Sequence, residues 1–394
     1  MHRAPALPFL LITVFLDLLG LGLVVPILPA LLTSVTANAA LWSGLLGTVF
    51  GLLQFTAAPF LGRLSDRYGR RPVLLLSLAC LGVDWLAHAV VQGPWPLLVV
   101  HSLAGACAGT NTVVNAYIAD VCTPEERPRA YGMIGSAFGL GFVAGPVLGG
   151  LLGAVDVRLP FLAAAALSFA NVAYGWLILP ESRPGDRSTP LSLGLVNPFT
   201  AIGAVLARPV LGRLAHARLH ADLARMIQQS TWAFFLTFHF AWDTTRVGLV
   251  IAAGALAGAL FQARAVQPVV RRIGEKPAAV IGTLISAVTF LGTAFVTAAW
   301  AFYLLQVLAV TAAVGGAAAS SWLSRTIGPE EQGAVQGALT SLAAVAETVV
   351  PLAAGVVFTW THPGTVYLGA ALFATASAVL LALTPGASRV STAS

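Results

Sequence analysis

The chain has little charge for its length. Only 9% of its 394 residues are charged, 58% are hydrophobic, and the mean hydropathy is +0.86. A soluble protein of this size needs far more charged surface, so a soluble fold is excluded. Long apolar runs satisfy their backbone polar groups in lipid only as helices. The sequence therefore predicts an all-α integral membrane protein.

The residue patterns of enzyme active sites are also missing. The sequence has no phosphate-binding glycine loop and no Ser/His/Asp or metal-ligand cluster with workable spacing. Its three cysteines, Cys80, Cys107 and Cys122, indicate neither a disulfide framework nor a metal motif. We expect a protein that is not an enzyme and has no cofactor or bound metal. Its energy would come from an ion gradient, with the proton as the coupling ion.

Twelve apolar runs are long enough to cross a bilayer, which takes about 20 residues each. The first is expected to be an uncleaved helix, because Asp17 interrupts it and more apolar helices follow. Most basic residues fall between runs on one predicted side, which indicates two cytoplasmic termini rather than nucleic-acid binding. The expected helices are 8–32, 40–61, 72–93, 95–119, 130–154, 159–179, 210–240, 246–268, 277–297, 299–323, 333–358 and 363–385.

One short segment concentrates charge between the second and third runs. Residues 62–72 hold one acid and four arginines. We expect a polar cytoplasmic loop in which Gly69 permits a tight turn and Pro72 occupies the first turn of the next helix. Asp66 is expected to pair with the neighbouring arginines and so lock the loop. The predicted cytoplasmic gate comprises Gly62, Asp66, Arg67, Gly69, Arg70 and Arg71.

The sequence repeats itself at one constant offset. Gly69 and Gly274 are 274 − 69 = 205 residues apart, and Pro146 and Pro351 have the same separation. This predicts two pseudo-symmetric six-helix bundles, an architecture of transporters whose substrate site lies near the midplane between the halves. The predicted domains are an N-terminal bundle at 1–180, a cytoplasmic linker at 181–208 and a C-terminal bundle at 209–394.

Ionisable side chains at membrane depth are costly and normally face a cavity. The same offset relates Asp17 to Asp222, so equivalent carboxylates are expected in the two halves. Arg218, Asp222, Arg225 and Gln229 would share one face of a helix. This predicts a charged wall of the transport cavity. The alternative is that this helix begins near residue 224 and the charged stretch is solvated.

The other polar candidates also have two interpretations. Asp17 could couple protons or clamp its helix to a neighbour, and Asp84 could couple protons or lie on a helix away from the cavity. His101 could titrate beside Asn111 and Asn115 or lie at the headgroup level. Gln228 and Gln229 could bind substrate or bond neighbouring helices. The predicted proton-coupling residues are Asp17, Asp222, Glu347, Asp84 and His101. The predicted substrate-binding residues are Arg225, Gln54, Asn111, Asn115, Gln228 and Gln229.

The segment Gly62 to Pro72 resembles the signature loop of the major facilitator superfamily, specifically of twelve-helix drug–proton antiporters related to the tetracycline-resistance pumps. Asp84 and Gln54 match polar positions of those pumps. His101 stands where the family usually has arginine. Four residues resemble the antiporter motif that separates exporters from importers, and their spacing also allows close helix contact and a kink. These are Gly141, Gly145, Pro146 and Gly149.

The resemblance implies proton-coupled multidrug or tetracycline-like efflux of small, partly hydrophobic compounds by alternating access. The alternatives are a metabolite or sugar exporter on the same scaffold and a non-transporting membrane receptor. The expected location is the cell inner membrane, with multiple spans and both termini cytoplasmic. The expected partners are a small-molecule substrate, protons and lipid. We expect a monomer that binds no nucleic acid.

Overall fold

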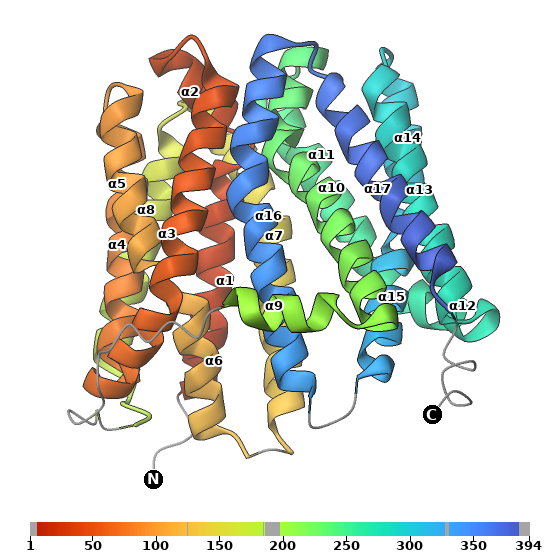
Figure 1. The fold of residues 1–394 in the computed structure, drawn as a ribbon. Coiled ribbons are helices and arrows are strands. Elements are labelled where there is room, and N and C mark those ends of the chain that lie inside the picture. The colour runs from red at the N-terminus through yellow and green to blue at the C-terminus, as the bar shows by residue number, and fades with distance from the viewer. Residues whose placement is uncertain (1–5, 124, 184, 186–197, 328–330, 386–394) are drawn as a thin grey trace. The chain divides into compact units, whose positions relative to one another are not determined.

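The computed structural model describes residues 6–123, 125–183, 185, 198–327 and 331–385, and every regular element within these ranges is a helix (Figure 1). Contacts divide the chain into two compact units. Unit 1 comprises Met1–Gly194 and Trp242–Ala255, and unit 2 comprises Leu195–Ala241 and Leu256–Ser394. This division crosses one helix, so the domain limits expected from the repeat remain a prediction.

The helices of unit 1 run close to the expected spans, two of which are broken into two helices each. They are α1 (Ala6–Val24), α2 (Leu28–Val35), α3 (Ala39–Tyr68), α4 (Arg70–Val90), α5 (Pro94–Cys107), α6 (Thr110–Val121), α7 (Arg127–Val155), α8 (Leu159–Ile178) and the first part of α11 (Thr244–Phe261).

Unit 2 contains the end of α11, which continues as a short π-helix. Its other elements are α9 (Pro198–Leu206), α10 (Pro209–Phe240), η1 (Gln262–Val266), α12 (Gln267–Ile273), α13 (Glu275–Phe295), α14 (Ala299–Thr311), α15 (Ala313–Thr326), α16 (Gln332–Trp360) and α17 (Thr365–Leu383).

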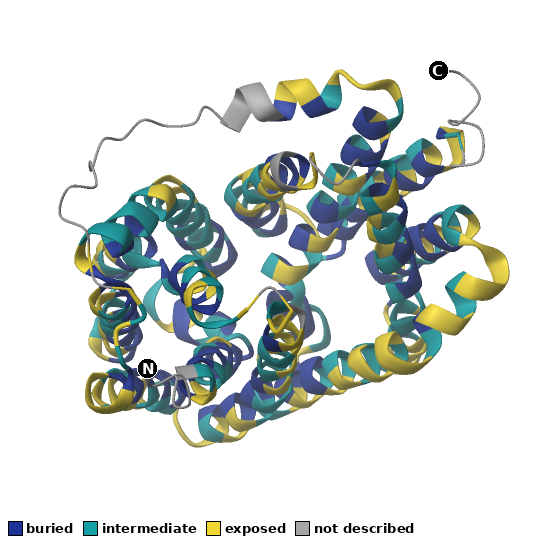
Figure 2. Cartoon of the chain, turned by 90° about the horizontal axis from the view of Figure 1, so that it is seen from below, coloured by how far each residue is buried: buried dark blue, intermediate teal, exposed yellow. Residues whose placement is uncertain are grey.

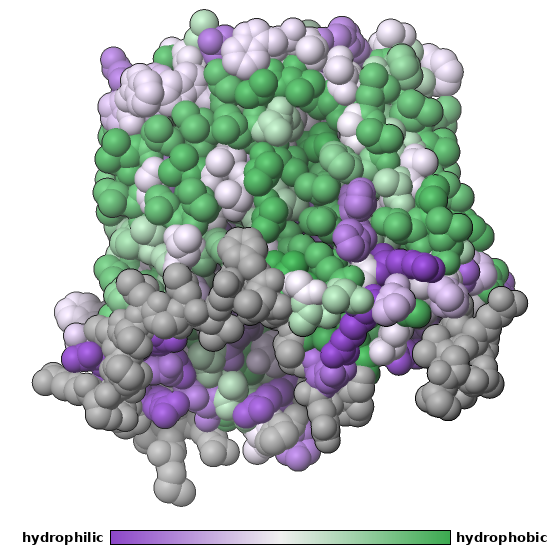
Figure 3. Space-filling model, in the orientation of Figure 1, coloured by the Kyte–Doolittle hydropathy of each residue, from purple (hydrophilic) through white to green (hydrophobic). Residues whose placement is uncertain are grey.

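Eleven spans of the described chain are long and apolar enough to cross a membrane. The remaining expected span is α10, a continuous helix of 32 residues whose N-terminal half carries several charges. Apolar side chains form a broad band on the face in Figure 3, and hydrophilic ones gather below it. Buried residues on the helices of each unit mostly face one another (Figure 2). The chain is therefore a multi-span helical membrane protein.

The expected loop at 62–72 is almost entirely helical, so this prediction is wrong. Helix α3 continues to Tyr68, α4 begins at Arg70, and Gly69 alone separates them with a φ of 100°. Arginine is a good helix former, and the two helices keep their geometry beyond the end of the apolar stretch. A backbone bond from the Gly69 N–H to the Ser65 carbonyl closes α3.

The repeat extends to the limits of the helices. Helices α4 and α13 begin and end at the same offset as Gly69 and Gly274, and so do α7 and α16. Gly274 also has a positive φ, 87°, between α12 and α13. Only glycine adopts that conformation readily, so Gly69 and Gly274 each allow the turn between two helices in their own half.

Helix α7 packs closely against α1 through the stripe of glycines Gly141, Gly145 and Gly149. A Cβ built on Gly141 would lie 2.6 Å from the Phe15 carbonyl oxygen, and one on Gly145 would lie 2.6 Å from the Gly22 Cα. A Cβ on Gly149 would also overlap the Leu23 backbone. The two backbones therefore touch along this stripe.

We expect Gly145→Ala to destabilise the protein by about 1–3 kcal/mol, because the added methyl group must push α7 away from α1. Thermal unfolding of the detergent-solubilised protein measures this effect. Gly135→Ala on the same helix is the matched control, because a Cβ there meets nothing within 4 Å. Equal unfolding temperatures for the two variants would contradict the close packing.

Candidate functional site

The charged face of α10 is held together by ion pairs. The buried Asp222 carboxylate, in a residue that is 4% exposed, accepts Arg218 Nε at 2.7 Å and Arg225 Nη2 at 3.4 Å. Arg225 Nη1 also donates to Gln229 Oε1 at 3.0 Å. The helix does not begin near residue 224, because α10 is continuous from Pro209. The side chains of Arg218 and Arg225 are 47% and 49% exposed, so a cavity wall and a solvated stretch both remain predictions.

A second carboxylate lies within electrostatic range of this network. Glu347 is an exposed residue of α16 that interacts electrostatically with Arg225 and Asp222. The two arginines and two carboxylates balance when both acids are ionised. A proton on either acid would leave one guanidinium charge uncompensated. Gln228, also predicted to bind substrate, is half-buried on α10 and makes no described hydrogen bond in this network.

In unit 1, Asp17 is half-buried on α1 and receives a hydrogen bond from Thr110 at the start of α6. Asn111 and Asn115 follow as exposed residues of α6, and Gln54 is half-buried on α3. The structure thus places Asp17 beside the N-terminal turn of α6. No pattern in the sequence indicates that Thr110 would contact Asp17.

His101 and the two asparagines lie on two separate helices, so their helical spacing does not place them side by side, and the pairing remains a prediction. The expected fourth helix breaks at Ala108 and Gly109, and His101 lies on α5. Its Nδ1 instead lies 2.8 Å from Asp84 Oδ2, and its side chain is only 18% exposed.

A third residue joins this pair. His88, one turn after Asp84 on α4, is 2% exposed, and its Nδ1 lies 3.5 Å from Asp84 Oδ1. Sequence reasoning missed His88, although its spacing of four residues from Asp84 was a usable signal.

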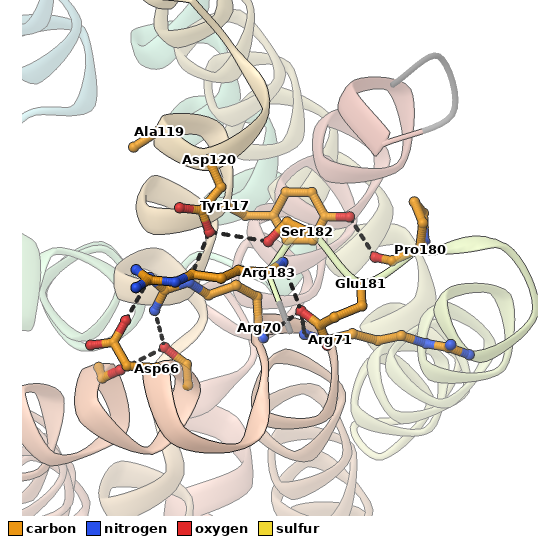
Figure 4. A network of polar contacts seen from close by, with 12 residues as sticks. Asp66, Arg70, Arg71, Tyr117, Ala119, Asp120, Pro180, Glu181, Ser182 and Arg183 are labelled. Carbon is orange, nitrogen blue, oxygen red and sulfur yellow. Dashed lines mark hydrogen bonds and ion pairs between the residues drawn. The ribbon is translucent and has the colours of Figure 1, made fainter. Parts of the chain in front are cut away.

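Arg70 is the centre of the polar network at the junction of α3 and α4 (Figure 4). Its residue is 6% exposed, and its guanidinium binds Asp66 at 2.7 Å, Asp120 at 3.0 Å and the Ser65 hydroxyl at 2.6 Å. Asp120 also accepts a bond from the Ser182 hydroxyl at 3.1 Å. The network thus ties α3, α4 and α6 to the segment after α8.

The other predicted gate residues surround this centre. Gly62 lies on α3, where Arg67 stands 5.7 Å from the Tyr68 ring centroid. Arg71 on α4 donates from its side chain to the Trp176 carbonyl. Gly69 provides the break between the two helices.

Glu181 holds the first turn of α4 (Figure 4). Its carboxylate accepts the backbone N–H groups of Arg70 at 2.7 Å and Arg71 at 3.2 Å, which no helix carbonyl can satisfy. A negative charge is also favourable at a helix N-terminus. Neither Glu181 nor Asp120 was predicted, because their partners are distant in the sequence.

We expect Glu181→Gln to lower stability by about 0.5–2 kcal/mol, the usual effect of losing a helix cap. The amide keeps one acceptor oxygen but loses the charge. Thermal unfolding measures the change, and Glu125→Gln is the control, because Glu125 is an exposed residue after α6. No difference between the variants would contradict the capping role.

The family model of the Major Facilitator Superfamily matches residues 10–237 and 214–393, which together cover nearly the whole chain. The chain belongs to the major facilitator superfamily. Similar curated proteins include the class C tetracycline resistance protein of Escherichia coli, 36% identical over 88% of each chain, and the class D protein of Salmonella ordonez, 32% identical over 96% of each.

The solved structure of the human organic anion transporter MFSD10 shows the same fold, with a TM-score of 0.68 and 24% identity, over 97% of this chain and 100% of that one. Family and fold together make this major facilitator chain a multi-pass membrane transporter and not an enzyme. The resemblance to the tetracycline-resistance pumps is thereby confirmed.

Proposed function

We propose that this transporter exports small, partly hydrophobic, tetracycline-like compounds from the cell across the inner membrane in exchange for protons, by alternating access. The observation that carries the proposal is the buried Asp222 between Arg218 and Arg225. The tetracycline resistance proteins that it resembles over most of its length support the substrate class. They favour drug export over the metabolite, sugar and receptor alternatives.

Charge balance supplies the coupling in this proposal. With Asp222 and Glu347 ionised, the site is neutral and accepts the substrate. A proton on Glu347, the exposed acid, leaves one guanidinium charge uncompensated and repels a cationic or electron-poor substrate. Loss of the proton to the cytoplasm restores the neutral site. Asp17 would serve the same cycle in unit 1.

The test is proton release on substrate addition. Purified protein in weakly buffered detergent solution is mixed with tetracycline, and the pH change is followed with a dye. We expect stoichiometric proton release, which a receptor would not show. The same compound, among a panel of drugs, should be tolerated better by a pump-deficient bacterial host that expresses the chain. The proposal would be overturned by tetracycline binding without proton release. It would also be overturned if the host gained tolerance to none of the drugs.

A further inference from the structure

Three potential metal ligands converge between α4 and α5 of unit 1. One ligand atom each from Asp84, His88 and His101 can be chosen so that all lie within 4.8 Å of one another. Asp84 and His88 come from consecutive turns of α4, and His101 faces them from α5. The drug-export proposal assigns no metal to these residues.

The carboxylate of this cluster is short of partners. Asp84 is fully buried, and its Oδ1 has no hydrogen bond. The described ion pairs of Asp84 are with the two histidines, and neither histidine is a permanent cation. A buried carboxylate without full compensation is costly, so the site favours an added positive charge.

The surroundings hold the His88 imidazole as metal-bound histidines are usually held. His88 Nδ1 lies 2.9 Å from the backbone carbonyl of Asp84, and donation to it leaves the lone pair on Nε2. The His88 ring stacks on Phe161 at an interplanar angle of 5°, and the His101 ring stacks on Phe50 at 30°. These contacts restrict the rotation of the donors.

We propose that Asp84, His88 and His101 bind one divalent transition-metal ion of the Zn²⁺ type, which links α4 to α5. Two imidazoles and one carboxylate form a known zinc donor set that leaves a fourth position for water. Bonds of about 2.0–2.2 Å place tetrahedral ligand atoms roughly 3.3 Å apart. His101 Nδ1 already lies 2.8 Å from Asp84 Oδ2, and one ligand atom from each of the three residues lies within 4.8 Å of the other two, so modest side-chain movements reach this geometry.

The donor set also determines which ions fit. Imidazole suits Zn²⁺, Co²⁺ and Ni²⁺, whereas Mg²⁺ and Ca²⁺ prefer oxygen ligands. His101, with an 18% exposed side chain, is the ligand through which an ion would reach the two buried ones. Excess Mg²⁺ should therefore fail to displace bound Zn²⁺.

The experiment is equilibrium dialysis of the full chain, purified with a histidine-free tag, against micromolar Zn²⁺ with millimolar Mg²⁺ present. Elemental analysis should find one Zn²⁺ per chain, and Co²⁺ should give a visible absorption band. Asp84→Asn, His88→Gln and His101→Gln should each weaken binding by at least the roughly 10–100-fold that loss of a second-shell partner causes. Zn²⁺ should also raise the unfolding temperature of the unaltered protein but not of these three variants.

The matched control is the double variant His216→Gln with His220→Gln. These histidines are also four residues apart on one helix, α10, and each has Nδ1 2.7 Å from the carbonyl four residues before it. The double variant should bind Zn²⁺ normally. No binding by the unaltered protein, or loss of binding in the control only, would overturn the proposal. Because the readout is metal content and stability, the result is independent of drug export.

Discussion

Asp222→Asn is expected to lower the drug tolerance conferred by the transporter by about 10–100-fold, to near that of the empty host. The carboxylate is buried between two guanidinium groups, and hydrogen bonds to charged groups are worth about 1.5–3 kcal/mol. Asparagine fills the same volume but carries no charge and takes up no proton. The loss corresponds to one or two factors of ten in an equilibrium constant.

The measurement combines tolerance of a pump-deficient host, the amount of protein in its membranes, and proton release by the purified variant. Asp243→Asn is the control, because that acid caps α11 through the Arg246 N–H at 2.8 Å and lies outside the α10 network. It should export normally. An Asp222→Asn protein that exports drug and releases protons like the unaltered chain would contradict the assignment.

The second large effect is expected for Arg70→Ala. Removing one partner of a buried ion pair costs about 3–5 kcal/mol. The side chains of Asp66 and Asp120 are 36% and 19% exposed, so water compensates part of the loss and we expect about 2–3 kcal/mol. Export should fall as well, because the junction of α3, α4 and α6 loses its central contact. Thermal unfolding and drug tolerance measure the two effects.

Two further variants make this test specific. Arg71→Ala removes a neighbouring arginine whose described side-chain hydrogen bond is to the Trp176 carbonyl, and it should cost much less. Adding Asp120→Asn to Arg70→Ala removes one of the stranded carboxylates and should recover part of the stability. If Arg70→Ala and Arg71→Ala unfold at the same temperature, Arg70 is not the centre of the network.

The fold was predictable because its signals are local. Most apolar runs form a helix within their own bounds, although several are broken into two helices, and the constant offset of Gly69 and Gly274 matches the limits of α4 and α13. The same reasoning failed at residues 62–72, where the charged residues after an apolar run were predicted to form a loop. Residues 62–68 continue α3, since helix geometry depends on backbone bonds and propensity rather than on apolarity.

The candidate sites were predictable only in part. The residues of the α10 network lie on one helix, so helical spacing could find Asp222 and Arg225 together. Glu181 and Asp120 reach Arg70 from other elements, and His101 reaches Asp84 from α5. No spacing rule applies to such pairs, because tertiary packing alone sets their distance.

Helix α10 is less apolar than the eleven other spans, and this affects whether the number of membrane crossings is even or odd. An even number of crossings returns a chain to the face from which it started, whereas an odd number leaves it on the opposite face. The eleven apolar spans taken alone would put Ala6 and Leu383 on opposite faces. The expected placement of both termini on one side therefore depends on α10 as the twelfth crossing.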